Sequence, residues 1–187
     1  MRDKEMKSED MSRMTKIAIA LAATTAMTMS ATSAANAAPT AAKSVKVNVT
    51  YTGELTWQST ESVINVTTLT GKSGKVTDAF TSITGKGLAA VPSSGCTPFR
   101  GDGTLKGKKG TIVFTIASTA QACSAGEAAP ALVEAKGTAT VKSGTGTYKG
   151  ATGSMTFKGT FMVQSVAAGA KETDKFTVTF TGTLKTK

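Results

Sequence analysis

An alternation of apolar and polar residues is the strongest constraint on the fold, and it begins after residue 43. Between residues 45 and 51 the odd positions carry Val, Val, Val and Tyr, and the even positions carry Lys, Asn and Thr. Residues 112–116, 155–163 and 176–184 also place their large apolar side chains on one parity. Successive side chains of a strand point to opposite faces, so this pattern is typical of strands with one buried face. The sequence therefore predicts an all-β fold.

Four weaker strands are expected at residues 62–70, 77–85, 101–106 and 133–141, with Gly and Lys-Gly pairs marking the turns. Eight short antiparallel strands form either a closed barrel or a sandwich. Closure removes the exposed edge strands, which protects a chain rich in Thr and Val from aggregation. We therefore expect an eight-stranded antiparallel β-barrel with large apolar residues inside and Thr and Lys outside.

Residues 1–37 have the pattern of a bacterial signal peptide that forms a helix ahead of the barrel. Arg13 and Lys16 precede an apolar stretch of small residues at 17–29, and Ala35-Asn36-Ala37 then supplies the small-x-small pattern of a cleavage site. The apolar stretch is shorter than the roughly 20 residues that span a bilayer. We therefore expect a secreted, extracellular protein that keeps no membrane anchor after cleavage.

Cleavage after Ala37 would start the mature protein at Ala38 and leave residues 38–187 as a single barrel domain. Residues 1–10 are unusually charged for a signal peptide. Met11 or Met14 is therefore an alternative start of translation.

Cys96 and Cys123 are the only two cysteines of the chain. Export would place them in an oxidising compartment, where a disulfide is expected. Such a bond closes a loop of about 28 residues and is worth roughly 3–4 kcal/mol if it acts on chain entropy. Cys96 precedes the strand expected at residues 101–106, and Cys123 lies in an expected small-residue loop at 117–131. The disulfide would thus fix one end of the barrel; two free, buried thiols are the alternative.

Composition excludes several kinds of site. The chain has no His, so Cys/His zinc sites and His-dependent catalytic triads are excluded, and we expect neither a metal nor a cofactor.

The chain is basic, with 22 Lys and Arg against 12 Asp and Glu and a net charge of +10. These cations are scattered along the chain, and nearly all of those after residue 37 are Lys. Nucleic-acid binding surfaces combine clustered Arg with stacking aromatics, so no nucleic-acid partner is expected.

Carboxylates are the remaining candidates for acid–base chemistry, and no catalytic residue can be assigned among them. Glu54 lies close to Trp57 in the sequence, and Glu134 interrupts the apolar parity of an expected strand. An inward-facing Glu134 beside an aromatic ring would be the best sign of an enzyme. A solvent-facing strand position is the interpretation that we favour for this residue.

One segment of the chain recurs. Residues 103–114 and 146–157 share the pattern G-T-[LY]-K-G-x-x-G-[ST]-[IM]-x-F. We interpret each copy as a strand end, a tight glycine-rich turn and the start of a new strand, because Gly adopts positive φ where a chain reverses. A phosphate-binding loop would need a helix to follow, which the pattern does not predict. The turn glycines are Gly107, Gly110, Gly150 and Gly153.

The runs at residues 103–111 and 144–153 resemble an uncharacterised bacterial family of small β-barrels. That family is similar in turn to the allene oxide cyclase and dirigent proteins, which are calycin-like barrels of eight strands. The resemblance covers roughly Phe99–Phe161 and implies the fold. Its motifs are turn glycines, so it implies no set of catalytic residues in this chain.

Three interpretations of function follow. The first is a monomeric, non-catalytic barrel that binds a small apolar or amphiphilic molecule in its interior. The second is a cell-envelope protein whose basic surface binds an anionic polymer, and the third is an isomerase or cyclase like the enzymes of the similar families. The sequence does not decide whether the inward side chains leave a ligand cavity or fill a solid core. The candidate lining residues are Tyr51, Trp57, Phe114, Phe157, Phe161, Phe176 and Phe180.

Overall fold

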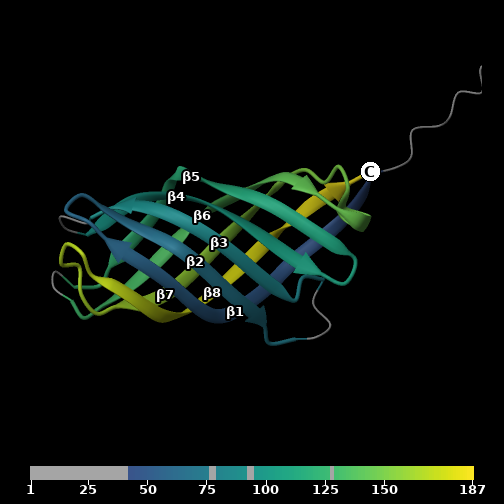
Figure 1. The fold of residues 1–187 in the computed structure, drawn as a ribbon. Coiled ribbons are helices and arrows are strands. Elements are labelled where there is room, and N and C mark those ends of the chain that lie inside the picture. Colours follow the sequence, from purple (N-terminus) through teal and green to yellow (C-terminus); the bar gives the residue numbers. More distant parts are fainter. Residues whose placement is uncertain (1–41, 76–78, 92–94, 127–128) are drawn as a thin grey trace, which may run out of the picture. The chain divides into compact units, whose positions relative to one another are not determined.

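The protein is described by a computed structural model in which eight antiparallel strands form a closed barrel (Figure 1). The expected signal peptide and its cleavage site between Ala37 and Ala38 lie outside the described residues, which are 42–75, 79–91, 95–126 and 129–187. The strands are β1 (Lys43–Ser59), β2 (Val63–Ser73), β3 (Ser82–Ala90), β4 (Cys96–Gly107), β5 (Gly110–Ser124), β6 (Ala131–Gly144), β7 (Ser154–Val163) and β8 (Lys171–Thr186).

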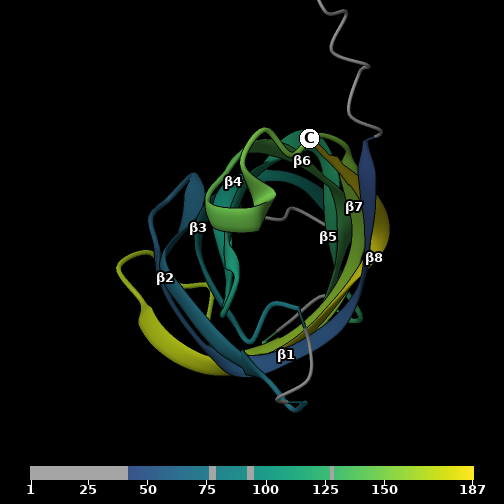
Figure 2. The same cartoon turned by 90° about the vertical axis from the view of Figure 1, so that its right-hand side faces the viewer.

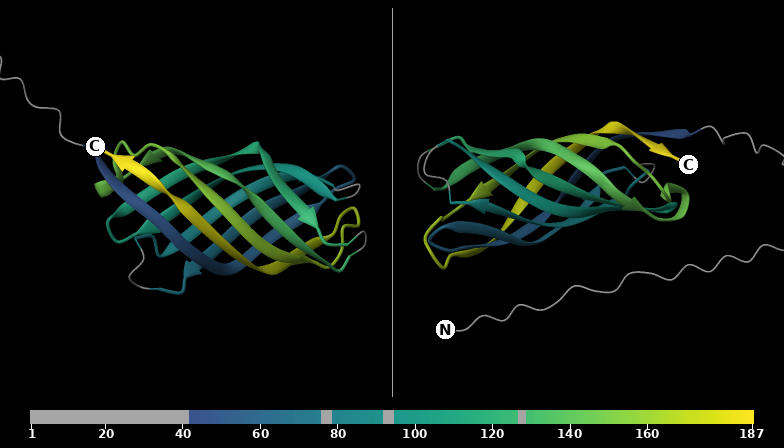
Figure 3. Two further views of the ribbon diagram at one scale, coloured as in Figure 1. Left: turned by 180° about the vertical axis from the view of Figure 1, so that it is seen from behind. Right: turned by 90° about the horizontal axis from the view of Figure 1, so that it is seen from above.

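Each strand pairs with the next, and β8 pairs with β1 to close the sheet. The closing register runs from Lys43 opposite Thr186 to Gln58 opposite Lys171. Seen from behind, the yellow β8 lies between β7 and the blue β1 (Figure 3). The predicted eight-stranded antiparallel barrel is therefore confirmed. Separately, the part of the chain that is described contains no helix long and apolar enough to cross a membrane.

The strand bounds differ from the prediction in several places. β3 was expected at residues 77–85 but occupies Ser82–Ala90. The loop expected at 117–131 is wrong in its first half, because β5 continues to Ser124. Ladder irregularities at Phe99/Gly101 in β4 and at Ile116/Gln121 in β5 interrupt the regular alternation there. Such bulges bend a strand and increase its twist, which suits a closed sheet.

Threonines form cross-strand pairs on the outer face. Three of these join hydroxyl oxygens at 2.8–3.0 Å: Thr50 with Thr179, Thr56 with Thr173, and Thr156 with Thr181. Opposed Thr side chains of this kind stabilise antiparallel sheets. The pairs link β1, β8 and β7, the strands that close the barrel.

A short 3-10 helix, η1 (Gly146–Tyr148), lies at the rim of one end of the barrel (Figure 2). Tyr148 is 4% exposed, and its ring packs on Phe80 with 4.7 Å between centroids. Tyr51 is completely buried and donates a 3.2 Å hydrogen bond from its hydroxyl to the carbonyl of Phe80. We call this part of the barrel the η1 half, and its interior is densely packed.

The two copies of the repeat fold differently. The first is the predicted hairpin, in which Gly107 and Gly110 pair at the turn between β4 and β5. The second contains η1 and is a longer connection between β6 and β7. Positive φ is found at three of the four predicted glycines, namely Gly110 (142°), Gly150 (72°) and Gly153 (120°). Glycine is needed at position 107 for a steric reason, because a Cβ there would collide with the carbonyl oxygen of Ala79.

Candidate functional site

The opposite part of the barrel, which carries the disulfide and is called the disulfide half, contains a cavity of about 230 Å³. Its walls are the inward faces of the strands, and it extends to rim residues that include Gly95, Ser124 and Val166. The space exists because several inward positions carry small side chains. These cavity-lining positions are Gly85, Gly87, Gly101, Ala122 and Ala135.

Six of the seven predicted lining residues contact the cavity. Tyr51 is the exception, since it lies in the densely packed η1 half and does not line the cavity. Tyr51 has the same parity as Trp57 on β1, and only its position along the strand separates it from the cavity. The residues that do line it are Trp57, Phe114, Phe157, Phe161, Phe176 and Phe180.

Four aromatic rings that line the cavity form a connected group. Phe180 lies 5.4 Å from Phe114 and 5.7 Å from Phe157, measured between ring centroids. Phe99 contacts Phe157 edge-on at 5.9 Å and also lines the cavity. Phe99 was not among the predicted lining residues, although it shares the parity of Leu105 on β4. The expected strand began at residue 101, whereas β4 begins at Cys96.

A buried hydrogen bond lies beside the cavity. The indole Nε1 of Trp57 donates to Oδ2 of Asp174 at 2.7 Å. Trp57 is 1% exposed and Asp174 is 9% exposed, which makes Asp174 the one buried carboxylate among the described residues. A buried indole N–H normally finds an acceptor, and a charged acceptor gives a strong bond. This pair fixes the orientation of the large indole in the cavity wall.

Parity could have identified Asp174, because it shares one face of β8 with Phe176 and Phe180. Asp174 was one of the carboxylates of the chain that we considered, but Glu134 was the one singled out as a possible inward-facing acid. Glu134 is exposed on β6, and the inward positions beside it are Val133 and Ala135. The solvent-facing interpretation of Glu134 is therefore the correct one.

The predicted disulfide between Cys96 and Cys123 is present, and the two residues face each other directly in the β4–β5 ladder. Both cysteines therefore lie in strands, which corrects the loop placement expected for Cys123. The bond is at the end of the β4–β5 hairpin remote from its turn, where Thr97 and Ala122 line the cavity. The disulfide thus holds two strands together at the cavity rim.

The side chains that line the cavity are mostly apolar, so a molecule inside it would make apolar contacts and few hydrogen bonds. Thr97 lines the cavity and is a buried residue with a hydroxyl group. In the described part of the chain no three His, Cys, Asp or Glu side chains are grouped so as to hold a metal ion. An interior of this kind selects a ligand mainly by size and hydrophobicity.

Comparisons with protein-family models, curated proteins and solved structures found no match to this chain. The resemblance to allene oxide cyclase and dirigent barrels therefore stays a prediction from the turn motifs.

Proposed function

We propose that this protein binds a small apolar or amphiphilic molecule in the cavity of the disulfide half. The observation that carries the proposal is the contrast between the two halves of one interior. The η1 half is filled by Tyr51, Phe80 and Tyr148, whereas the disulfide half leaves about 230 Å³ between apolar walls. Eight-stranded barrels can be filled completely by side chains or hold one small ligand, so a half-filled interior favours ligand binding.

The volume limits the ligand's size and affinity. An apolar cavity of about 150 Å³ accommodates benzene, so this cavity takes roughly nine carbon atoms. Burial of nine methylene groups at about 0.8 kcal/mol each gives about 7 kcal/mol. That free energy corresponds to a Kd of roughly 10 µM, and the entropy lost on association weakens binding further. We therefore propose a carrier or sensor of micromolar or weaker affinity.

Secretion is part of the proposal. The disulfide supports it, because such bonds persist in oxidising compartments.

Trp57 provides the assay, because it is the only Trp in the chain and it lines the cavity. cis-Parinaric acid is a suitable probe, since its conjugated tetraene accepts energy from an excited indole when the two are close. We expect saturable quenching of Trp57 together with sensitised probe emission. No saturable transfer up to the solubility limit of the probe would contradict the proposal.

Two variants of β6 make the test specific. Ala135 lines the cavity, so Ala135→Phe places a ring in the space that the probe needs and is expected to weaken binding at least tenfold. Thr138 is exposed on the same strand, so Thr138→Phe adds the same ring outside. Equal probe binding by the two variants would place the probe somewhere other than the cavity. Far-UV circular dichroism confirms that each variant is folded.

A further inference from the structure

The barrel wall is interrupted between β7 and β8 in the disulfide half. The ladder between these strands ends at Phe161 opposite Phe176, although β7 continues to Val163 and β8 begins at Lys171. Beyond that point each strand pairs only with its other neighbour, β7 with β6 and β8 with β1. Two adjacent strands thus separate while each keeps its pairing on the other side.

A side chain closes the far end of this interruption. The backbone N–H of Gln164 donates to Oε2 of Glu172 at 2.9 Å, where a continued ladder would supply a carbonyl. The segment that follows is held to β1, because Oγ of Ser59 donates to the carbonyl of Val166 at 3.2 Å and Gly169 N–H donates to the carbonyl of Ser59 at 2.9 Å. The gap between β7 and β8 therefore lies between the pair Phe161–Phe176 at one end and the contact of Gln164 with Glu172 at the other.

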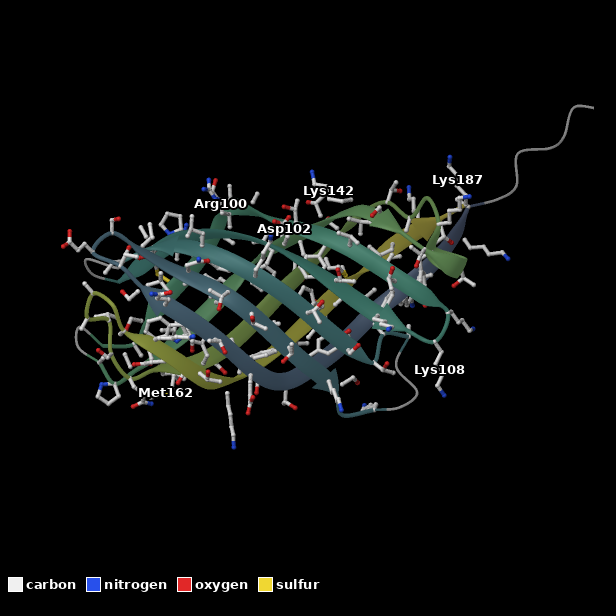
Figure 4. The ribbon with its side chains drawn as sticks, viewed as in Figure 1. Arg100, Asp102, Lys108, Lys142, Met162 and Lys187 are labelled. Atoms are coloured by element: carbon white, nitrogen blue, oxygen red, sulfur yellow. A yellow bond between two sulfur atoms is a disulfide. The ribbon has the colours of Figure 1, made fainter. Side chains whose placement is uncertain are left out.

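A hollow of about 490 Å³ lies on the outer face at this place. It is lined by Leu132 and Met162, which are 40% and 38% exposed and are two of the three large hydrophobics exposed in the described residues. Met162 lies on the outside of the barrel toward the disulfide half (Figure 4). Two exposed apolar side chains thus lie together in one hollow of the outer face.

The outer hollow and the inner cavity share part of their lining. Phe161 and Phe176 face inward by parity, yet both residues also line the hollow outside. They are the last pair of the β7–β8 ladder, and beyond them the two strands are joined by the contact of Gln164 with the side chain of Glu172 rather than by further ladder pairs. Movement of these two rings would connect the cavity with the surface and would break no strand pairing.

We propose that the gap between β7 and β8 is a lateral portal, through which a single-chain amphiphile inserts its apolar tail into the cavity. This inference rests on the proposed function and adds the ligand class and its route. About nine carbons of the tail fill the cavity, and the rest of the molecule lies along the portal. Its polar end stays in the outer hollow, whose polar lining consists of Thr52, Thr160, Thr177, Glu54 and Lys175.

Association kinetics with cis-parinaric acid test the portal by stopped-flow energy transfer from Trp57. Phe161→Ala removes one of the two rings and is expected to raise the association and dissociation rate constants together, by about tenfold. Phe99→Ala is the matched control, since Phe99 is also a partly buried ring that lines the cavity, but it lies on β4 and is not part of the β7–β8 gap. It should raise mainly the dissociation rate constant. A faster association in Phe99→Ala with no change in Phe161→Ala would overturn the portal.

A chemical block gives a second test that leaves the interior intact. Met162→Cys can be labelled at its exposed position with a bulky maleimide without a reductant, so the native disulfide is preserved. Labelling is expected to slow association at least fivefold, whereas the same label on Thr138→Cys should have no effect. If the unmodified protein binds no probe, the proposed function itself fails. If it binds and neither Phe161→Ala nor the label changes the association rate, only the portal is refuted.

Discussion

Replacement of Asp174 by Leu is the sharpest stability test of the interior. The substitution keeps a side chain of similar length but removes the acceptor for Nε1 of Trp57, which is 2.7 Å away. Because Trp57 is only 1% exposed, water cannot easily replace the lost partner. The indole N–H would then be buried without a hydrogen bond. Stability should therefore fall even though an apolar residue enters an apolar interior.

The expected loss is about 2 kcal/mol. A hydrogen bond to a charged group contributes about 1.5–3 kcal/mol, and an unsatisfied buried donor costs a further 1–3 kcal/mol. Burial of the leucine side chain returns roughly 1.5–3 kcal/mol of this. Asp174→Asn keeps an acceptor oxygen and should lose about 1 kcal/mol or less. For a domain of this size, 2 kcal/mol lowers Tm by about 4–8 °C.

Urea unfolding followed by far-UV circular dichroism measures these changes independently of the Trp signal. A double-mutant cycle that combines Asp174→Leu with Trp57→Phe isolates the pair, and its coupling free energy should be about 1.5–3 kcal/mol. A buried carboxylate also carries a desolvation penalty, and its replacement by an apolar residue can stabilise a protein. If Asp174→Leu were as stable as the unmodified protein, that penalty would exceed the hydrogen bond and our reasoning would be refuted.

Three further substitutions test other parts of the fold. Gly103→Ala should lower the free energy of unfolding by about 1–3 kcal/mol, because its Cβ would collide with the ring of Phe114; unchanged urea stability would contradict this packing. The double substitution Cys96→Ala/Cys123→Ala should cost about 3–4 kcal/mol, given the 27-residue separation, and calorimetry that found no loss would refute the entropic account. Tyr148→Ala should cost about 3–5 kcal/mol and leave cis-parinaric acid binding unchanged, since Tyr148 packs in the η1 half; a changed Kd would show that the two halves are coupled.

Parity along the strands predicted the all-β fold and most of the inward aromatic residues, and the closure of exposed edges then favoured a barrel over a sandwich. Phe157, Phe176 and Phe180 could be placed inside because each lies in a regular alternation that no bulge interrupts. Parity does not state how far along the barrel axis a residue lies. Tyr51 and Trp57 therefore looked equivalent, although the register places one in the packed half and the other in the cavity wall.

The second half of β5, which contains Cys123, could not be recognised from its own residues. Residues 117–122 are mostly small or polar and have low strand propensity. Residues 120–122 pair with β4, residues 121 and 122 also pair with β6, and the disulfide follows at Cys123, so the interactions that hold this part of β5 are non-local. The cavity was equally inaccessible to prediction, because it arises where small residues of different strands, such as Gly101 and Ala135, face the same space.

The seam between β1 and β8 has a consequence for how the protein is made. β8 is the last strand to leave the ribosome, and β1 is the first, so the seam can form only when synthesis of the barrel is complete. Until then β1 and β7 are open edges, which are the part of a sheet most prone to pair with other chains. A chain that has not yet formed β8 therefore exposes two strand edges that the complete barrel hides.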